Sequence, residues 1–224
     1  MPPFEAQIPQ GGLLIAVEGC DGSGKSTQIG LLYRHLRRKG LPVHLTSWNS
    51  SPSVHPLQRQ AKRERILTPR TYALLNASDF ADRYEREIAP RLRLRQIVLC
   101  DRYVGTAYAR DEARGLDRTW IARLYDFART PDLTLFFHAP PEVAAARLVA
   151  NRHGIGYYEA GLDLGLSEDP LESFRIFQGR VLRCYEQDEG PLGYVRIDAT
   201  RRLRVQQREV RRIVGRLVFG GDAQ

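Results

Sequence analysis

The residues with the clearest chemical signature form one stretch, EGCDGSGKST, at positions 18–27. The spacing Gly-x4-Gly-Lys-Ser is typical of a loop whose backbone N–H groups surround phosphates. In such a loop the lysine reaches the outer phosphates and the hydroxyl helps to hold Mg2+. An apolar run precedes the stretch and a helical pattern follows it, as this kind of loop requires. The sequence therefore predicts a nucleotide-binding loop that includes Gly19, Gly22, Ser23, Gly24, Lys25, Ser26 and Thr27.

A second signature is the acidic and basic pair that closes the run IVLCDRY, at residues 97–103. An aspartate at a strand end near a phosphate-binding loop can complete the shell of a Mg2+ ion held by Ser26. The plainer alternative is that Asp101 only caps the strand. Arg102 is expected to point into the same cleft, where phosphoryl transfer gathers negative charge. We predict Lys25, Asp101 and Arg102 as catalytic residues, and Ser26 and Asp101 as metal ligands.

Five short apolar runs, separated by segments with helical spacing, must position these residues. The runs are nearly continuous rather than alternating, which is typical of parallel strands covered on both faces. Strands that alternate with helices favour a three-layer α/β/α fold with a five-stranded parallel sheet. The predicted strands are residues 13–18, 42–46, 97–101, 133–138 and 194–198. The same spacing predicts a helix that ends at Gly40 and a C-terminal helix with Leu203, Val210, Val214 and Leu217 on one face.

Two irregular segments interrupt this alternation. Residues 47–56, SWNSSPSVHP, are polar and follow the second strand, so they are expected at the carboxyl edge of the sheet, where such folds bind ligands. Residues 151–170 contain four glycines and mixed charge, and we predict that they form a mobile lid. No internal repeat or linker divides the sequence, so residues 1–224 are predicted to form a single domain.

The composition restricts the class of protein. The 224 residues carry a formal net charge of +8, and the basic residues are spread along the chain rather than clustered. This spread favours solvated helix faces and a small-molecule partner over a nucleic-acid surface. Three widely separated cysteines fit neither a disulfide framework nor a zinc site and indicate a reducing compartment. Because no signal-peptide pattern or bilayer-length apolar run is present, the sequence predicts a cytoplasmic protein without a membrane segment.

The order of motifs along the chain resembles that of the thymidylate kinases. After EGCDGSGKST come TPRTYALLNASDFADR, DRY, PDLTLFF, PPEVAAARLVANR, FQGRVLRCY and RIDAT, so the likeness covers about nine-tenths of the chain. The resemblance implies a P-loop NTPase fold with a lid and the activity of a nucleoside monophosphate kinase. It also implies Mg·ATP as the phosphoryl donor, a nucleotide as the acceptor and a homodimer.

The resemblance further implies roles for residues on the donor side. Asp21 matches an acidic position of the phosphate-binding loop in bacterial members. Arg147 and Arg152 match the start of the lid, where those members place an arginine that acts in the transition state. Which of the two arginines acts is left open. The turn that contains Ala199 and Thr200 matches the segment that lines the adenine pocket.

On the acceptor side the resemblance implies that Arg102 holds the acceptor phosphate and that Arg83 hydrogen-bonds the thymine ring. The stacking phenylalanine of the family falls at Asp79 in this chain, with Phe80 adjacent to it. Trp48 is a second candidate for the stacking role, although a lone tryptophan in a polar loop also serves as a hydrophobic plug.

Other acceptor-side positions depart from the family pattern. Thr106 lies in the stretch after Asp-Arg-Tyr that borders the acceptor, and Arg110 and Asp111 replace a tyrosine beside the sugar and a glutamine next to it. Because a buried charge requires a partner, Arg110 and Asp111 are expected to pair with each other or with Asp79. The segment after the second strand also lacks the arginine that the family commonly has there. In the lid, Tyr158 is expected either to close over the substrate or only to dock the lid.

The leading hypothesis is transfer of the γ-phosphoryl group of ATP to dTMP, which gives dTDP and ADP. A kinase of the same fold that acts on another nucleotide, nucleoside or small molecule would explain the missing arginine. An NTPase switch that binds nucleic acid or protein would suit the positive charge, but the sequence has no Asn-Lys-x-Asp guanine-reading motif. A degenerate binding module would require a broken catalytic set, whereas Lys25, Ser26, Asp101 and Arg102 are all present.

Overall fold

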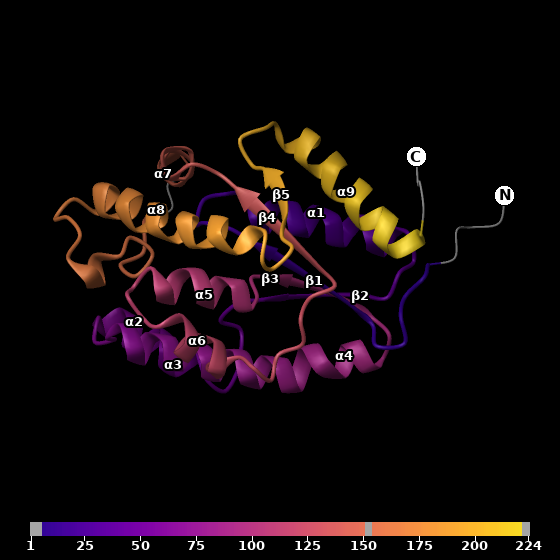
Figure 1. The fold of residues 1–224 in the computed structure, drawn as a ribbon, viewed down its shortest axis with the longest axis horizontal. Coiled ribbons are helices and arrows are strands. Elements are labelled where there is room, and N and C mark those ends of the chain that lie inside the picture. Colours follow the sequence, from indigo (N-terminus) through magenta and orange to yellow (C-terminus); the bar gives the residue numbers. More distant parts are fainter. Residues whose placement is uncertain (1–5, 151–153, 221–224) are drawn as a thin grey trace.

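The computed structural model describes residues 6–150 and 154–220, and five parallel strands form its centre (Figure 1). The strands lie in the order β2-β3-β1-β4-β5. Their bounds are Leu13–Glu18 for β1, Val43–Ser47 for β2, Ile97–Asp101 for β3, Leu133–His138 for β4 and Val195–Asp198 for β5. The structure therefore confirms the predicted α/β fold with a five-stranded parallel sheet.

Three strand bounds differ from the sequence prediction by one residue: the start and the end of β2, which extends to Ser47, and the start of β5. Strand β2 begins at Val43 because Pro42 has no N–H group to give to the ladder, although its carbonyl accepts from Ile97. Strand β5 begins at Val195 because the Tyr194 N–H donates to the carbonyl oxygen of Glu189 (2.8 Å) at the end of the preceding helix.

Helices cover both faces of the sheet. Their bounds are α1 (Lys25–Arg38), α2 (His55–Glu64), α3 (Pro69–Arg83), α4 (Ala89–Arg93), α5 (Val104–Glu112), α6 (Arg118–Leu124), α7 (Pro141–Ala150), α8 (Pro170–Glu189) and α9 (Leu203–Phe219). A π-helical turn, η1 (Tyr84–Ile88), joins α3 to α4, and a 3-10 turn, η2 (Leu162–Leu164), lies between α7 and α8. The expected helix after the phosphate-binding loop and the expected C-terminal helix are both present.

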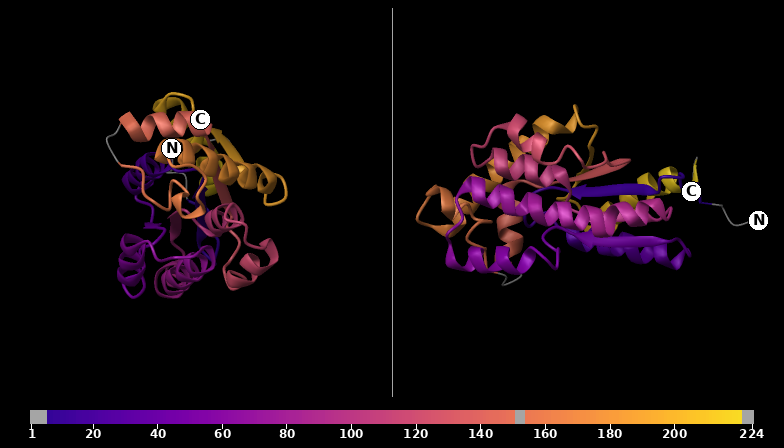
Figure 2. Two further views of the ribbon diagram at one scale, coloured as in Figure 1. Left: turned by 90° about the vertical axis from the view of Figure 1, so that its left-hand side faces the viewer. Right: turned by 90° about the horizontal axis from the view of Figure 1, so that it is seen from below.

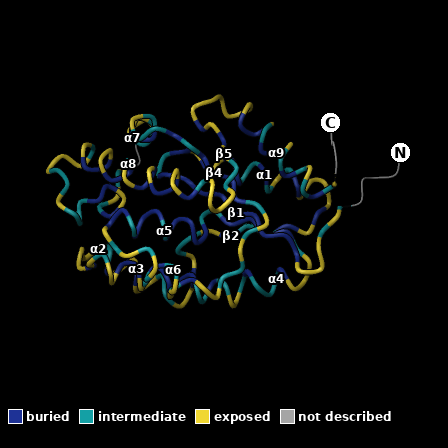
Figure 3. The backbone as a smooth tube through the Cα atoms, in the orientation of Figure 1, coloured by how far each residue is buried: buried dark blue, intermediate teal, exposed yellow. Residues whose placement is uncertain are grey.

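The central strand shows why the sheet needs helices on both faces. Leu13, Ile15 and Val17 of β1 pack with the apolar side chains of α1 and α9. Leu14 and Ala16 point the other way, into a cluster formed with α3, α4 and α5. Every residue of β1 is buried, so its apolar run is continuous rather than alternating (Figure 3).

The views from three directions show how the helices are arranged around the sheet. Helices α7, α8 and α9 lie on the opposite side of the molecule from α2 and α3 (Figures 1 and 2). On α9 the buried apolar face consists of Val210, Val214 and Val218, whereas Leu203 is 46% exposed. Leu203 is the first residue of the helix, so the apolar face predicted from the sequence is present but is exposed at this end.

The segment at residues 47–56 is only partly a loop. Trp48–Val54 is irregular, but His55 and Pro56 already form the first turn of α2, and Pro is well tolerated at that position. The segment follows the carboxyl end of β2, as predicted. It therefore meets the loops that follow β1 and β3 at one edge of the sheet, where parallel α/β folds bind their ligands.

Candidate active site

The loop between β1 and α1 has the backbone geometry of a phosphate-binding loop. Gly22 and Gly24 both adopt positive φ angles (78° and 89°), a conformation that favours glycine. A Cβ atom on Gly22 would lie 2.6 Å from the carbonyl oxygen of Ala144 in α7, so no side chain fits at this position. Helix α1 begins directly after Gly24 with Lys25, so its free N–H groups and positive dipole end face the loop.

Lys25 is buried inside this loop. Its ammonium group donates to the carbonyl oxygen of Cys20 (2.6 Å) and to the hydroxyl of Ser23 (3.3 Å). Burial, together with the nearby Arg102, lowers the pKa of Lys25 to about 8. A phosphate bound in the loop would supply the negative charge that this ammonium group lacks.

A cavity of about 780 Å³ opens in front of the loop; we call it the P-loop pocket. Its walls come from the loop, the carboxyl ends of β2 and β3, the start of α9, and side chains of α5 and α7. Predicted site residues that line it are Asp21, Gly22, Ser23, Gly24, Lys25, Ser26, Thr27, Trp48, Asp101, Arg102, Arg110 and Arg147. The fold thus brings together most of the residues singled out in the sequence.

Arg102 is held rigidly at the end of β3. Its backbone has a φ angle of 74°, which is rare for a residue with a side chain, and its N–H donates to the carbonyl oxygen of Val17 (3.0 Å). Its guanidinium group donates to the carbonyl oxygen of Gly19 (3.1 Å) and to the hydroxyl of Thr106 (3.2 Å). Strained backbone of this kind persists where the surrounding structure fixes it and is typical of functional sites.

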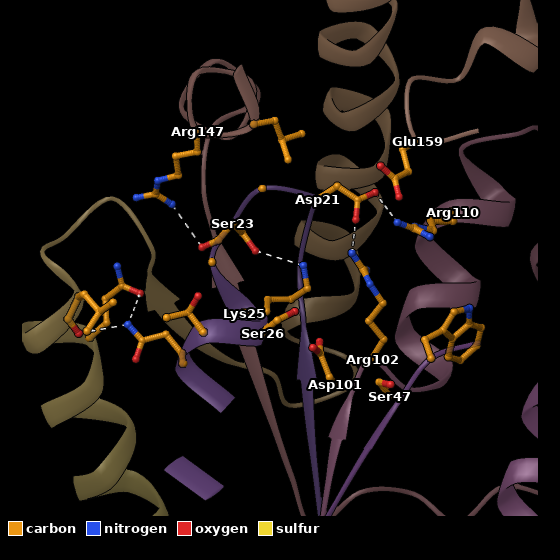
Figure 4. Close-up of a pocket in the computed structure, with 18 of the residues that line it drawn as sticks. Asp21, Ser23, Lys25, Ser26, Ser47, Asp101, Arg102, Arg110, Arg147 and Glu159 are labelled. Atoms are coloured by element: carbon orange, nitrogen blue, oxygen red, sulfur yellow. Dashed lines mark hydrogen bonds and ion pairs between the residues drawn. The ribbon is translucent and has the colours of Figure 1, made fainter. Parts of the chain in front are cut away.

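The acidic residue of the loop, Asp21, lies between two arginines (Figure 4). Arg102 donates to one of its carboxylate oxygens and Arg110 donates to the other. Burial alone would raise the pKa of Asp21, but Arg110 and Arg102 hold it well below its usual range. Asp21 in turn raises the pKa of Arg110 against the effect of burial. The expected pairing of Arg110 with Asp111 or with Asp79 is not what the structure shows.

Asp111 and Asp79 are buried carboxylates with different surroundings. Asp79 accepts the N–H of Ser51 (3.2 Å), so it fixes the loop after β2. Neither carboxylate oxygen of Asp111 has a hydrogen-bond partner among the described residues. Burial raises the pKa of Asp111 to about 7, although Arg114 and Arg110 oppose this shift.

Phe80, Trp48 and Arg83 form an aromatic and cationic cluster on the acceptor side. Phe80 is 1% exposed and contacts Trp48 at a ring separation of 5.6 Å, so it belongs to the wall behind Trp48. The Arg83 guanidinium lies 5.6 Å from the Trp48 ring and 5.3 Å from the Phe80 ring. Two of its nitrogens, Nε and Nη1, have no hydrogen-bond partner in the described structure. Arg83 is only 2% exposed and is not among the residues that line the P-loop pocket, so these unpaired donors lie behind Trp48 rather than at the pocket surface.

Thr106 lies behind Arg102 rather than at the pocket surface. It is fully buried, and its hydroxyl donates to the carboxylate of Glu18 (2.6 Å). Glu18 also accepts the N–H groups of Tyr103 and Thr106 (2.8 and 3.1 Å) and the hydroxyl of Tyr185 (2.9 Å). Burial raises the pKa of Glu18 despite these bonds. This network fixes the start of α5 and, through Thr106, the guanidinium of Arg102.

The described part of the lid region, residues 154–169, docks against α3 and α5. The hydroxyl of Tyr158 accepts the N–H of Leu67 (3.0 Å), and its ring stacks on Tyr72 at 5.2 Å. Arg114 donates to the carbonyl oxygen of Tyr158 (2.6 Å) and to the carboxylate of Asp163 (3.0 Å). These contacts tie Tyr158 to Leu67 and Tyr72, and Tyr158 is not among the residues that line the P-loop pocket.

Arg147 and the turn after β5 meet on the donor side of the pocket. The Arg147 guanidinium donates to the carbonyl oxygen of Ala199 (2.7 Å) and to that of Ser23 (3.3 Å). Thr200 is exposed, and both its N–H and its hydroxyl donate to Asp198. Arg147 therefore links the phosphate-binding loop to the turn expected to line the adenine pocket. Arg152 lies outside the described residues.

The structure also adds functional candidates that the sequence analysis missed. Gln178 of α8 is fully buried; its amide nitrogen donates to the Glu159 carbonyl oxygen (2.9 Å) and its amide oxygen accepts the Asp21 N–H (3.1 Å). It therefore joins the lid to the loop. A glutamine on the buried, apolar face of a predicted helix was the signal that could have identified it. Arg201 also lines the P-loop pocket, and no spacing in the sequence indicated it; Glu159, which follows Tyr158 in the predicted lid, lines the pocket as well.

A metal-binding cluster and a membrane-spanning helix are both absent from the described residues. Within residues 6–150 and 154–220, no three or more His, Cys, Asp or Glu side chains are grouped so as to hold a metal ion. No helix in the same ranges has the length and apolar character needed to cross a membrane.

These observations define a class of protein. A phosphate-binding loop between β1 and α1, at the centre of a parallel sheet, faces cationic side chains that come from β3, α5 and α7. A pocket that combines a phosphate-binding loop with arginines from other elements is the arrangement required for phosphoryl transfer. The chain is therefore a P-loop kinase.

Comparisons with known proteins identify the family. A family model for thymidylate kinase matches residues 17–210. The chain is 43% identical to a probable thymidylate kinase 2 of Saccharolobus solfataricus, over 92% of this chain and 97% of that protein. It is 33% identical to a probable thymidylate kinase of Pyrobaculum aerophilum, over 91% of this chain and 97% of that protein. It is also 33% identical to a thymidylate kinase of an Exiguobacterium species, over 89% and 92% of the two chains. The chain belongs to the thymidylate kinase family and is an ATP-dependent phosphotransferase that acts on a nucleotide.

Proposed function

We propose that this enzyme transfers the γ-phosphoryl group of ATP to dTMP. The observation that carries the proposal is the P-loop pocket, a single cavity that joins Lys25 and Ser26 to Arg102, Arg110 and Trp48. One phosphate oxygen of the acceptor forms a bond to the γ-phosphorus, and the bond from that phosphorus to the bridging oxygen breaks. The electron pair of the broken bond leaves on ADP, so a dianionic acceptor releases no proton.

On the donor side, the backbone N–H groups of residues 22–27 surround the phosphates and Lys25 reaches the outer ones. The adenine ring lies against the turn at Ala199 and Thr200, which Arg147 ties to the loop. Asp21, in the same loop, pairs with Arg102 and Arg110. This assignment follows the direction in which α1 presents its free N–H groups.

Mg2+ fits the donor set of the pocket. The Ser26 hydroxyl and the Asp101 carboxylate both line it, and Mg2+ is typically bound by one or two protein oxygens together with substrate phosphates. When bound, the ion neutralises phosphate charge. We propose Ser26 and Asp101 as its protein ligands.

On the acceptor side, we propose that Arg102 holds the phosphate and that the unpaired donors of Arg83, behind Trp48, bind the base. Trp48 presents a partly exposed ring at the pocket wall, backed by Phe80. The remaining acceptor-side candidates act behind these residues: Thr106 braces Arg102, Asp79 fixes the loop after β2, and Asp111 lies buried near Arg110.

Catalysis then depends on positioned positive charge, since phosphoryl transfer needs no protein nucleophile. Lys25, Arg102 and Arg147 all point into the same cavity. Arg147 donates to the Ser23 carbonyl oxygen in the loop, so a small rotation brings it to the transferred group. We propose Arg147 as the arginine that stabilises the transition state, with Arg152 as the alternative.

We further propose that the chain is a single kinase domain in which residues 151–170 act as a lid. The described part of this segment is held by Tyr158, Arg114 and Gln178, which contact α3, α5 and the loop. In the described structure the segment is packed shut, since Tyr158 and Ala160 are buried in two apolar clusters, and access for a nucleotide would require these contacts to open.

A homodimer and a cytoplasmic location complete the proposal. Leu74 of α3 and Phe127, which follows α6, are 44% and 41% exposed, and apolar side chains of this kind support a contact with a second copy. Cys20, Cys100 and Cys184 are free thiols, which supports a reducing compartment. Light scattering coupled to size-exclusion chromatography measures the oligomeric state.

A second candidate function is the same reaction with another acceptor. It is favoured by Asp111, a buried carboxyl group without a hydrogen-bond partner among the described residues, and by the absence of arginine from residues 47–54. Both features depart from the sequence pattern of the family on the acceptor side.

The experiment that tests both candidates measures ADP release from Mg·ATP with dTMP, dUMP, UMP, CMP, AMP, GMP and thymidine as acceptors. The proposal expects the highest kcat/KM with dTMP and no release above background for Lys25→Ala. A higher kcat/KM with another acceptor would replace dTMP by that compound.

A further inference from the structure

The pairing around Asp21 concentrates positive charge at one place in the pocket. Arg102 and Arg110 each contact a different oxygen of the same carboxylate, and the three side chains are only 11–14% exposed. Two cations therefore share one directly bonded carboxylate, and Glu159, which lines the same pocket without a hydrogen bond to Arg110 among the described contacts, adds a second negative charge nearby. Both arginines and Asp21 line the P-loop pocket, so their excess positive charge faces a ligand bound there.

The two arginines are held in different ways. Arg102 is fixed by its backbone and by bonds to Gly19 and Thr106. The guanidinium of Arg110 donates one hydrogen bond within the described residues, to Asp21. A guanidinium group carries five N–H donors, so most of those on Arg110 are available to a ligand.

The position of Arg110 places it at the acceptor end of the pocket. Arg110 lies two helical turns beyond Arg102, on the helix that begins at Val104. Among the cations of the described chain that line the pocket, Lys25 lies inside the phosphate-binding loop, and Arg147 and Arg201 lie at the turn between β5 and α9, which is assigned to the donor side. Arg102 and Arg110 are the two that remain.

The loop after β2 lends no charge to this end of the pocket. Residues 47–54, SWNSSPSV, contain neither lysine nor arginine, although Trp48 and Asn49 line the pocket. A phosphate monoester at neutral pH carries close to two negative charges. Arg102 alone would neutralise only one of them.

We propose that Arg110 binds the phosphate of the acceptor together with Arg102. The two guanidinium groups form a phosphate clamp, and their contacts with Asp21 fix their positions before the acceptor binds. This inference rests on the proposed function. Two guanidinium groups can each bind a different oxygen of the phosphate, and the third terminal oxygen stays free to attack ATP. Because each arginine has N–H groups beyond the one on Asp21, the carboxylate keeps its contacts when the acceptor binds.

The contacts behind Arg110 support this role. Arg114, one turn further along, donates to the carbonyl oxygen of Arg110 (3.2 Å) and to that of Tyr158 in the lid region (2.6 Å). The turn of α5 that carries Arg110 is thereby tied to the lid. A lid that closes over the acceptor would bring this turn with it.

The test compares dTMP with thymidine, which lacks the phosphate. Affinities are measured without ATP by calorimetry for dTMP and by displacement of dTMP for thymidine. For Arg110→Gln we expect a loss of dTMP affinity of about 10- to 100-fold and a change of less than about threefold for thymidine. Arg110→Lys keeps the positive charge but lacks the planar set of N–H donors of a guanidinium group. Its dTMP affinity should lie between that of Arg110→Gln and that of the wild type.

Arg118→Gln is the matched control. Arg118 is also a partly buried arginine with two carboxylate partners, Glu112 and Asp188, but it does not belong to the pocket lining. Replacing Arg118 should leave the ratio of the dTMP affinity to the thymidine affinity unchanged. A similar fall of this ratio in Arg118→Gln and Arg110→Gln would overturn the proposal.

Two other results would also overturn it. If dTMP and thymidine lose affinity in parallel, Arg110 borders the nucleoside rather than the phosphate. If Asp21→Asn and the double variant Asp21→Asn/Arg110→Gln bind dTMP equally well, Arg110 serves only as the counter-ion of Asp21. The double variant also removes the unpaired carboxylate that could unfold Arg110→Gln. Failure of the proposed function gives a different result, because the wild-type enzyme then binds another nucleoside monophosphate more tightly than dTMP. In that case the same variants are compared with that monophosphate and its nucleoside in place of dTMP and thymidine.

Discussion

The proposed donor end and the proposed acceptor end of the pocket are built in different ways. The phosphate site of the donor end is one continuous segment, residues 18–27, whose backbone shape comes from its glycines and from the start of α1. The acceptor end is assembled from the loop after β2, from α3 and α5 and from the lid region. Its main contact, between Asp21 and Arg110, joins residues that are 89 positions apart.

This difference explains how each end can change. In the phosphate-binding loop, a Cβ on Gly22 would collide with the backbone of α7. This position therefore tolerates no substitution. The acceptor end is built from side chains on separate helices, so a basic residue that is absent from one element can be replaced by a basic residue on another. Here the loop after β2 has no basic residue, and Arg110 on α5 adds one. Variants at the donor end should therefore cost more than variants at the acceptor end.

The largest effect is expected for Lys25→Ala, which removes the buried ammonium group of the donor end. We expect kcat to fall on the order of 10³-fold, because a preorganised charge at the transferred group is lost. Steady-state ADP release with dTMP measures the effect. Lys39→Ala is the matched control, since Lys39 lies just beyond the other end of α1 and contacts the Phe219 ring at 5.0 Å. If Lys25→Ala keeps more than about a tenth of the wild-type kcat, variants at the donor end do not cost more than variants at the acceptor end.

The second effect concerns Arg147→Ala, at the junction of the loop and the turn after β5. If Arg147 stabilises the transition state, kcat should fall about 100-fold while KM for ATP changes little. Arg175→Ala, an exposed position on α8, is the control. An unchanged kcat with a raised KM for ATP would show instead that Arg147 only shapes the adenine side through Ala199.

The contrast between the two ends also explains what the sequence could and could not predict. The strands were placed to within one residue, because a continuous apolar run is a local signal. Lys25 and Ser26 likewise belong to a local motif, and the structure places both in the pocket. The Asp21–Arg110 pair depends on how α5 lies against the loop, which no spacing encodes. The sequence instead suggested Asp111 or Asp79 as the partner, because these residues are adjacent or share the expected pocket.

The third prediction uses Asp111, whose buried carboxyl group belongs to the acceptor end. Burial raises the pKa of Asp111 from its ordinary value of 3.8 to about 7, so between these pH values the native protein holds a proton that the unfolded chain has released. Stability therefore falls as pH rises from about 4 to about 7, and the full loss persists above that range; it amounts to about 4 kcal/mol at most. Asp111→Asn cannot ionise and should be more stable than the wild type by about 2 kcal/mol at pH 8, a Tm increase of several degrees.

The measurement is thermal unfolding at pH 5 and pH 8. The gain from Asp111→Asn at pH 5 should be less than half the gain at pH 8, because Asp111 is then largely protonated in the native wild type. Asp163→Asn is the contrasting variant: Asp163 pairs with Arg114 at 3.0 Å, so its loss should lower Tm at pH 8. A gain for Asp111→Asn that does not change with pH would show that burial of the charge is not its cause.

The smallest effect is expected for Trp48→Phe, because phenylalanine keeps an aromatic face at the acceptor end. The Trp48 ring lies 5.6 Å from Phe80 and 6.3 Å from Tyr125, so a smaller ring still has these neighbours to pack against. We expect KM for dTMP to rise about two- to fivefold, which corresponds to roughly 0.5–1 kcal/mol. Trp120→Phe, on α6, is the matched control because Trp48 and Trp120 are the two tryptophans of the chain. Binding of dTMP should change the tryptophan fluorescence of the wild type and of Trp120→Phe but not that of Trp48→Phe. A fluorescence change that survives in Trp48→Phe would place the base away from Trp48, and the acceptor end would then rest on its arginines alone.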